Sequence, residues 1–187
     1  MWRELGITAY SGGNLEEALK AFDALLEINP FDISGMHMAS IVRSDAKKEI
    51  DKSVRLAVVA HELVKDDPIV LDSLGWALIN AGQVNAGLEK CRQALEQIPD
   101  DETVQYHLGV GHALKGDIRK SKSYLLASLK GEMPSHAATR ARDILREKDE
   151  DTEKTITVHK LILSAWGKPS VPSTSQIHLK AWSFPLT

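Results

Sequence analysis

Apolar residues recur along most of the chain at intervals of three and four positions, which is the spacing of one face of an α-helix. The clearest run follows Gly13 and comprises Leu15, Ala18, Leu19, Phe22, Leu25 and Leu26. Pro30 then ends it, because proline cannot continue a helix. The alternation of β-branched residues that is typical of strands is absent before residue 155. The pattern therefore predicts an all-α protein.

Two sets of glycines recur at a constant interval. Leu-Gly pairs occur at Leu5-Gly6, Leu74-Gly75 and Leu108-Gly109, and a second glycine follows each pair at Gly13, Gly82 and Gly116. The second and third sets are 34 residues apart, whereas the first and second sets are 69 residues apart. A period of this size indicates a repeat protein. We expect a diverged repeat with a one-residue insertion between the first two sets.

Each repeat is expected to hold two helices. The segment Gly13-Asn14-Leu15-Glu16-Glu17 is typical of a helix end followed by a new cap and an acidic first turn. Gly82 and Gly116 stand in the same place in the later repeats.

Residues 2 to about 133 resemble the tetratricopeptide repeat. The matching positions of the first repeat are Trp2, Leu5, Gly6, Ala9, Gly13, Ala18, Phe22, Leu25 and Pro30; those of the third are Leu71, Leu74, Gly75, Leu78, Gly82, Gly87, Cys91, Ala94 and Pro99; those of the fourth are Gln105, Leu108, Gly109, His112, Gly116, Ser121, Leu125 and Ser128. The second repeat matches through Ser53, Ala57 and Ala60, but residues 36–46 fit no unique register. The resemblance implies a right-handed α-solenoid of about four antiparallel helix pairs.

The small residues of the Leu-Gly pairs have a physical role in this fold. Gly6, Gly75 and Gly109 let the two helices of a pair approach closely, and Gly13 stands at a turn that needs positive φ. A helix pair cannot bury its apolar face alone, so the repeats are expected to stack.

A further helix is expected over residues 135–148. Ser135 can cap it, Ala138, Ala141, Ile144 and Leu145 recur at helical spacing, and basic residues occupy its other side. This is the composition of a C-terminal capping helix. We therefore expect a repeat array with its capping helix over residues 1–149.

Residues 150–187 differ in composition from the array. No Asp or Glu follows Glu153, and the segment contains Ser, Thr and Pro residues after Gly167. We expect a basic and poorly ordered tail. Residues 156–166 within it are compatible with a short docked helix, a strand or a disordered binding motif.

Composition narrows the range of partners. The 187 residues carry a formal net charge of −3, which does not suggest nucleic acid or a membrane surface as a partner. No apolar run is long enough for a membrane span. The expected location is cytoplasmic for the chain as written, or periplasmic if it is a fragment of an exported protein. Trp2 already occupies the fourth position of a repeat, so the first helix has almost no lead-in, which suggests a fragment or a frayed first helix.

No catalytic or cofactor-binding pattern stands out. His61-Glu62 begins like a zinc-protease helix, but Lys65 occupies the place of the second histidine. Cys91 takes the position of a core aromatic residue and His112 that of a packed tyrosine, so both are expected in the core or at its boundary. We expect no enzyme activity, no metal and no cofactor.

The first helices carry the candidate binding residues. In the family these helices line a concave groove, and the positions carried over are Arg3, Ile7, Tyr10, Asp72, Trp76, Ile79, Asn80, Tyr106 and Val110. Residues 69–79 are apolar almost all round, so Trp76 and Ile79 exceed what packing on one side needs. They are expected either to face a ligand or to be covered by neighbouring helices. Asp72, Trp76 and Tyr106 are expected to line one continuous surface.

Two functions fit these patterns. The first is a protein-interaction scaffold that binds an extended or helical peptide of another protein in the groove. The alternative is a structural segment of a larger repeat protein, such as one associated with bacterial export or exopolysaccharide, without a ligand of its own. In either case the array ends also allow self-association.

Overall fold

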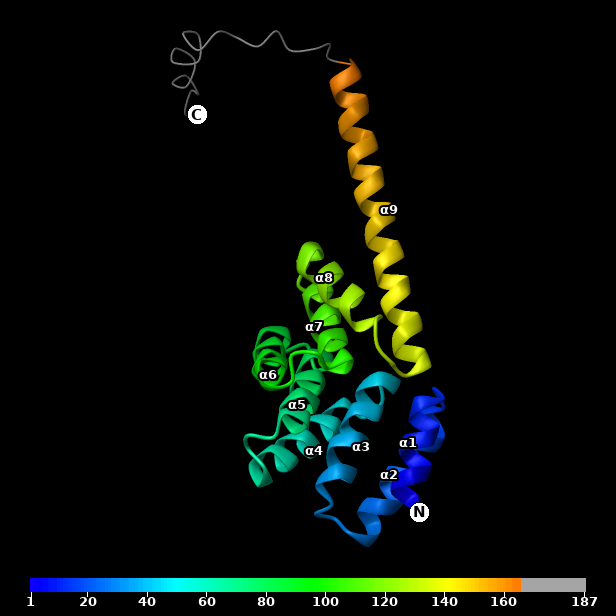
Figure 1. Cartoon of the computed structure of the whole chain (residues 1–187), viewed down its shortest axis with the longest axis vertical. Helices are drawn as coiled ribbons and strands as arrows, with labels where there is room; N and C mark the ends of the chain where they lie inside the picture. Colours follow the sequence, from blue (N-terminus) through cyan, green and yellow to red (C-terminus); the bar gives the residue numbers. More distant parts are fainter. Residues whose placement is uncertain (166–187) are drawn as a thin grey trace, which may run out of the picture. The chain divides into compact units, whose positions relative to one another are not determined.

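The computed structural model describes the backbone of residues 1–165 and the side chains of residues 1–150. Its elements are α1 (Trp2–Ser11), α2 (Leu15–Ile28), α3 (Ile33–Ala46), α4 (Ile50–Leu63), α5 (Pro68–Asn80), α6 (Val84–Gln97), α7 (Glu102–Leu114), α8 (Ile118–Ser128) and α9 (Ser135–Ala165) (Figure 1). Every regular element of the described residues is a helix, which confirms the predicted all-α class. In this part of the chain no helix is both long and apolar enough to cross a membrane.

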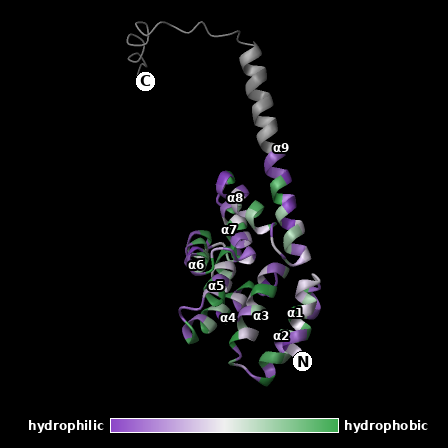
Figure 2. Cartoon of the chain, viewed as in Figure 1, coloured by the Kyte–Doolittle hydropathy of each residue, from purple (hydrophilic) through white to green (hydrophobic). Residues whose placement is uncertain are grey.

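Consecutive helices form four pairs, and the pairs stack. The partners α1–α2, α3–α4, α5–α6 and α7–α8 pack together, and each pair continues onto the next through α2–α3, α4–α5 and α6–α7. Neighbouring first helices also touch, as in α3–α5 and α5–α7. Hydrophobic residues are most evident on α3, α4 and α5, whereas α8 is largely hydrophilic (Figure 2). This arrangement is the predicted α-solenoid.

Aspartates cap the first helices at nearly constant spacing. The Asp32 carboxylate accepts a hydrogen bond from Gly35 N, Asp67 accepts from Ile69 N and Val70 N, and Asp101 accepts from Val104 N. Each cap satisfies backbone donors that the first helical turn leaves free, which is typically worth about 1 kcal/mol. Local sequence therefore determines where these helices begin.

The predicted roles of the glycines are confirmed. Gly13, Gly82 and Gly116 have φ between 81° and 83°, so each turn uses a conformation that other residues adopt at a cost. A Cβ on Gly75 would lie 2.8 Å from the carbonyl oxygen of Gly87 on α6, so only glycine permits this approach of α5 and α6.

The insertion in the second repeat lies in α3. This helix has 14 residues, whereas α5 and α7 have 13. The turn after it has no glycine and instead places Lys47 and Glu49 at φ 53° and 47°.

The interior of the second repeat is also unusually polar. Arg43 is fully buried, with its guanidinium 2.6 Å from Asp23 and 3.2 Å from the carbonyl oxygen of Ala39. Because charged residues normally indicate a surface, residues 36–46 show no clear apolar stripe. This explains why the sequence could not specify their register.

The chain divides into two compact units, residues 1–148 and 149–187. The expected helix over residues 135–148 is present as the first part of α9. The helix continues to Ala165, so most of residues 156–166 are helical. The remainder of the predicted tail, residues 166–187, lies outside the described residues.

Candidate protein-interaction face

The predicted groove residues differ in their exposure. Six are buried, namely Tyr10, Asp72, Trp76, Ile79, Tyr106 and Val110. Arg3 and Ile7 are exposed, and Asn80 is partly exposed. The sequence predicts that Trp76 and Ile79 either face a ligand or are covered, and in the structure they are 0% and 2% exposed. The alternative, cover by neighbouring helices, describes their position, and their role in peptide binding stays a prediction.

Trp76 and Tyr106 lie side by side, whereas Asp72 contacts His107, and one continuous binding surface of the three stays a prediction. The rings of Trp76 and Tyr106 have their centroids 5.7 Å apart. His107 stacks on Trp76 at 4.2 Å with an interplanar angle of 12°. Its Nδ1 lies 2.8 Å from Asp72 Oδ2. The 34-residue period brings α5 and α7 into register, so these side chains meet.

Asp72 makes its contacts in the protein interior rather than at the surface. Both Asp72 and His107 are buried, and the Cys91 thiol lies 3.9 Å from the Asp72 carbonyl oxygen. The other side-chain atoms of the pair, Asp72 Oδ1 and His107 Nε2, have no hydrogen-bond partner among the described residues. Asp72 therefore holds His107 against Trp76, a contact that the sequence did not predict.

Asp45 is the hydrogen-bonding centre of the first helices, and no pattern in the sequence singles it out. Its Oδ1 accepts a hydrogen bond from the indole Nε1 of Trp76 at 2.9 Å. Its Oδ2 accepts from the hydroxyl of Tyr10 at 2.8 Å and lies 3.0 Å from Nε2 of His136. The Asp45 side chain is only 2% exposed, and a buried carboxylate needs such partners to offset the loss of water. We call the surface formed by Tyr10, Asp45, Trp76 and Tyr106 the inner face.

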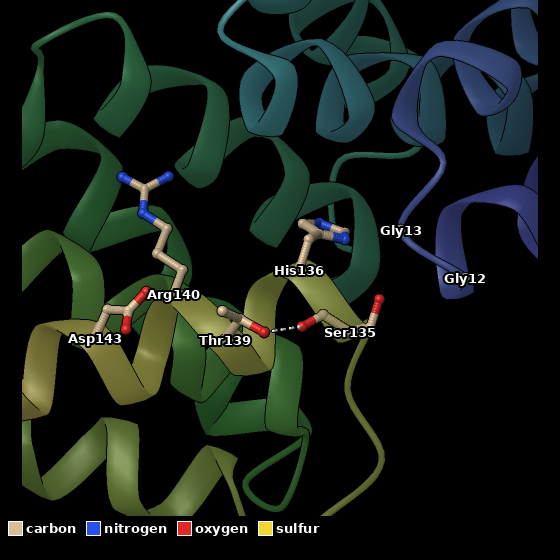
Figure 3. A pocket seen from close by; sticks show the side chains of 7 residues that line it. All are labelled: Gly12, Gly13, Ser135, His136, Thr139, Arg140 and Asp143. Atoms are coloured by element: carbon tan, nitrogen blue, oxygen red, sulfur yellow. Dashed lines mark hydrogen bonds between the residues drawn. The ribbon is translucent and has the colours of Figure 1, made fainter.

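The first part of α9 covers the inner face. Ala137 and Ala141 are buried in the same core cluster as Tyr10, Trp76 and Tyr106. The ring of His136 meets that of Tyr10 edge-on at 5.1 Å, and the positive charge of Arg140 opposes the rise in the pKa of Tyr106. Figure 3 shows His136 and Arg140 extending from α9, with Gly12 and Gly13 of the α1–α2 turn close to His136. The first part of α9 thus packs against residues of α1, α3 and α7.

The phenols on this face remain protonated donors at neutral pH. Burial raises the pKa of Tyr10 well above its ordinary value, and the negative charge of Asp45 raises it further. Burial and Asp45 also raise the pKa of Tyr106, against the smaller opposing effect of Arg140. Removal from water disfavours the charged form in both cases.

The edge of the inner face carries polar and apolar groups that remain accessible. Arg3 forms an ion pair of 2.6 Å with the helix-capping Asp32. Lys47 donates to the side-chain oxygen of Asn80, and its ammonium lies 5.9 Å from the centre of the Trp76 ring. Ile7 is 44% exposed. Lys47 and Asn80 border Trp76 of the buried aromatic cluster, and Ile7 lies one turn before Tyr10 on α1.

A pocket lies where α9 meets the α1–α2 turn. It has a volume of about 390 Å³ and is lined by Gly12, Gly13, Ser135, His136, Thr139, Arg140 and Asp143 (Figure 3). The side chain of His136 is 22% exposed. The packing of α9 against the first repeat therefore leaves an unfilled pocket.

Other candidate chemistry has ordinary surroundings. Cys91 is fully buried, and burial raises the pKa of its thiol well above the usual range, which disfavours a nucleophilic thiolate. His112 stacks on Tyr124 at 5.6 Å. Within the described side chains, His, Cys, Asp and Glu nowhere gather in a group of three or more that could hold a metal ion.

Known proteins share this fold of stacked antiparallel helix pairs. MamA from Desulfovibrio magneticus superposes with a TM-score of 0.52 at 19% identity, over 69% of this chain and 72% of that one. An O-GlcNAc transferase of Thermobaculum terrenum gives a TM-score of 0.57 at 21% identity, over 69% of this chain and 25% of that one. These similarities place the chain among helical-repeat solenoids.

Sequence comparison identifies a repeat at the start of the chain. Residues 1–32 match the family model described as tetratricopeptide repeat. A TPR repeat-containing protein of Pseudomonas aeruginosa is 32% identical over 80 residues, which are 43% of this chain and 13% of that relative. The chain thus spans about an eighth of the length of this relative. The chain thus resembles tetratricopeptide-repeat proteins over these residues, and such repeats generally serve as non-catalytic scaffolds for protein interaction.

Proposed function

We propose that the inner face and its edge form the site at which this scaffold binds a helical or extended segment of another protein. The observation that carries the proposal is the convergence of Tyr10, Trp76 and Tyr106 around the buried carboxylate of Asp45. Rigid aromatic side chains give large contact areas at low entropic cost and are enriched where binding energy concentrates.

A partner segment would extend from this centre onto the accessible edge. Ile7 offers an apolar contact there, and Arg3 and Asn80 offer polar ones. The edge thus combines apolar and polar side chains, and this mixture favours a specific partner over nonspecific binding.

Affinity capture with the full chain tests this proposal. Ile7→Asp changes the edge of the inner face, and Leu126→Asp is the matched control because Leu126 is also exposed and lies on a second helix. We expect Ile7→Asp to lose proteins that the wild type and Leu126→Asp retain. If the two variants capture the same proteins, the edge of the inner face is not part of the binding site.

The second candidate function is a structural segment of a larger repeat protein. It is favoured by apolar side chains exposed on the first repeat and just after it, with Ile28 at 72% and Phe31 at 71% exposure. Such side chains commonly mark contact surfaces. Sedimentation of the wild type and of Phe31→Ser across a range of concentrations tests it. Concentration-dependent association that Phe31→Ser abolishes would support contact through this end of the array.

A further inference from the structure

We infer that the first part of α9 is an intramolecular ligand of the inner face, and that a partner helix carries the same pattern of residues. This pattern has two small residues one turn apart, as in Ala137 and Ala141. A basic residue stands directly before each small residue, as His136 does before Ala137 and Arg140 before Ala141. The inference rests on the proposed function, since it specifies what kind of segment the inner face binds.

The small residues determine how closely a helix approaches. Ala137 and Ala141 are 2% and 0% exposed, and positions separated by four residues lie on one face of a helix. They pack in the cluster that contains Tyr10, Trp76 and Tyr106. Protein interiors have little spare volume, so larger side chains at these two positions would hold a helix away from the aromatic rings.

The basic residues determine the position along the face. His136 reaches the Asp45 carboxylate at 3.0 Å, and Arg140 follows one turn further along α9, where its charge acts on the phenol of Tyr106. The acceptor and the phenol come from α3 and α7, so a helix that carries both groups is held at two separated points. A carboxylate buried at 2% exposure strongly favours a donor opposite it, because an unpaired charge there is costly.

Several features favour release of α9 from this face. The connection from α8 to α9 comprises residues 129–134, which form no helix and include Gly131 and Pro134. The opposite side of α9 is open to solvent, where Arg142 and Arg146 are exposed. The pocket of about 390 Å³ beside His136 shows that packing against the first repeat is incomplete. Segments with fewer buried contacts open at lower free energy than the core.

Because α9 is covalently attached to the array, it occupies the inner face in preference to a free helix in solution. A tethered segment acts at an effective concentration of the order of millimolar, so an external helix binds measurably only when the internal contacts are weakened. The inference therefore predicts that weakening His136 and Arg140 opens the face to a helix added in solution.

The test uses the full chain and a fluorescein-labelled synthetic peptide of residues 134–149. Fluorescence anisotropy measures its binding to wild type, to His136→Ala/Arg140→Ala and to the control Arg142→Ala/Arg146→Ala. The control removes two basic residues of equal spacing from the exposed side of the same helix. We expect the first double variant to bind the peptide at least about ten-fold more tightly than the other two proteins. A peptide that carries His136→Ala and Arg140→Ala should lose that binding.

Each other outcome overturns the inference. Equal binding by all three proteins means that α9 does not occupy a binding site, and equal binding of both peptides means that the basic pair does not determine recognition. Loss of cooperative thermal melting in His136→Ala/Arg140→Ala means that α9 belongs to the fold's core. The proposed function fails separately, because it depends on the effect of Ile7→Asp on protein capture and not on this peptide.

Discussion

Asp45 and His136 lie 91 positions apart in the sequence, yet Nε2 of His136 is 3.0 Å from Oδ2 of Asp45. The contact joins the second repeat to α9, and the same carboxylate binds Tyr10 of the first repeat and Trp76 of the third. One buried side chain thus links four separate segments of the chain. The predictions below follow from this arrangement and from the packing around it.

Trp76 contributes both apolar packing and a hydrogen bond. Trp76→Ala should lower the free energy of unfolding by about 3–5 kcal/mol, since the side chain is fully buried. Trp76→Phe should cost less, although it leaves Asp45 without its indole donor. Chemical denaturation of both variants measures the difference. A wild-type melting temperature for Trp76→Ala would contradict burial and support a ligand-facing role instead.

Close helix packing depends more on Gly75 than on Gly109. A Cβ at Gly75 would meet the backbone of α6 at Gly87 O, 2.8 Å away, whereas the atoms nearest to a Cβ at Gly109 belong to the side chain of Leu125, and the nearest backbone atom is 3.1 Å away. Gly75→Ala should therefore cost about 1–3 kcal/mol, and Gly109→Ala should cost less. Thermal melting of the two variants provides the comparison. The reverse order would show that the α5–α6 contact can relax.

Gly82→Ala serves as a control of a different kind. A Cβ there meets no atom within 4 Å, but φ is +82°. A moderate loss, about 1 kcal/mol, is expected from backbone strain alone.

His37 should make stability depend on pH. Burial holds the pKa of His37 below its ordinary value of 6.5. At a pH between the lowered pKa of native His37 and about 6.5, the unfolded chain binds a proton that the native chain does not bind. The stability that neutral His37 gives is therefore present above about pH 6.5 and is lost as the pH falls below it. His37→Gln should flatten this loss between about pH 7.5 and 5.5.

The measurement is the free energy of unfolding of both proteins at several pH values. The pKa values of His61 and His112 are also lowered by burial, but these residues are common to both proteins, so the comparison isolates His37. Parallel stability profiles would contradict the assignment of His37 as a buried neutral side chain.

Cys91 reports on the integrity of the third repeat. Its thiol is fully buried and its pKa is raised by burial. Native protein should therefore react slowly with a disulfide reagent such as DTNB, and denatured protein should react at once, because the thiolate is the reacting form. Since this is the only cysteine of the chain, one absorbance trace suffices. Rapid reaction of the native protein would contradict the packing of α5 on α6.

Periodicity was sufficient to predict the fold and part of the site. The interval of 34 residues places Gly75 and Gly109 at equivalent helix contacts and brings Trp76 beside Tyr106. The spacing of a helix and the length of a repeat are local properties, so the sequence carries them directly. The burial of Asp72 could not be predicted from this interval, because no local pattern shows that His107 pairs with it.

The polar centre of the inner face could not be predicted in this way. Asp45 lies in the repeat whose longer α3 and buried Arg43 obscure the register. Its partner His136 lies outside the repeat period altogether. A signal existed in the alanines of α9, since Ala137 and Ala141 indicate a closely packed helix face, but the sequence does not say which surface receives it.

The most direct test of the account is a double-mutant cycle on Asp45 and His136. Asp45→Ala, His136→Ala and the double variant are unfolded with urea, and the coupling free energy follows from the three differences from wild type. The structure predicts a favourable coupling of about 1 kcal/mol or more, and the control cycle of Asp45→Ala with Arg142→Ala should be additive within about 0.5 kcal/mol. Additivity of Asp45→Ala with His136→Ala would contradict the claim that Asp45 holds α9 on the inner face.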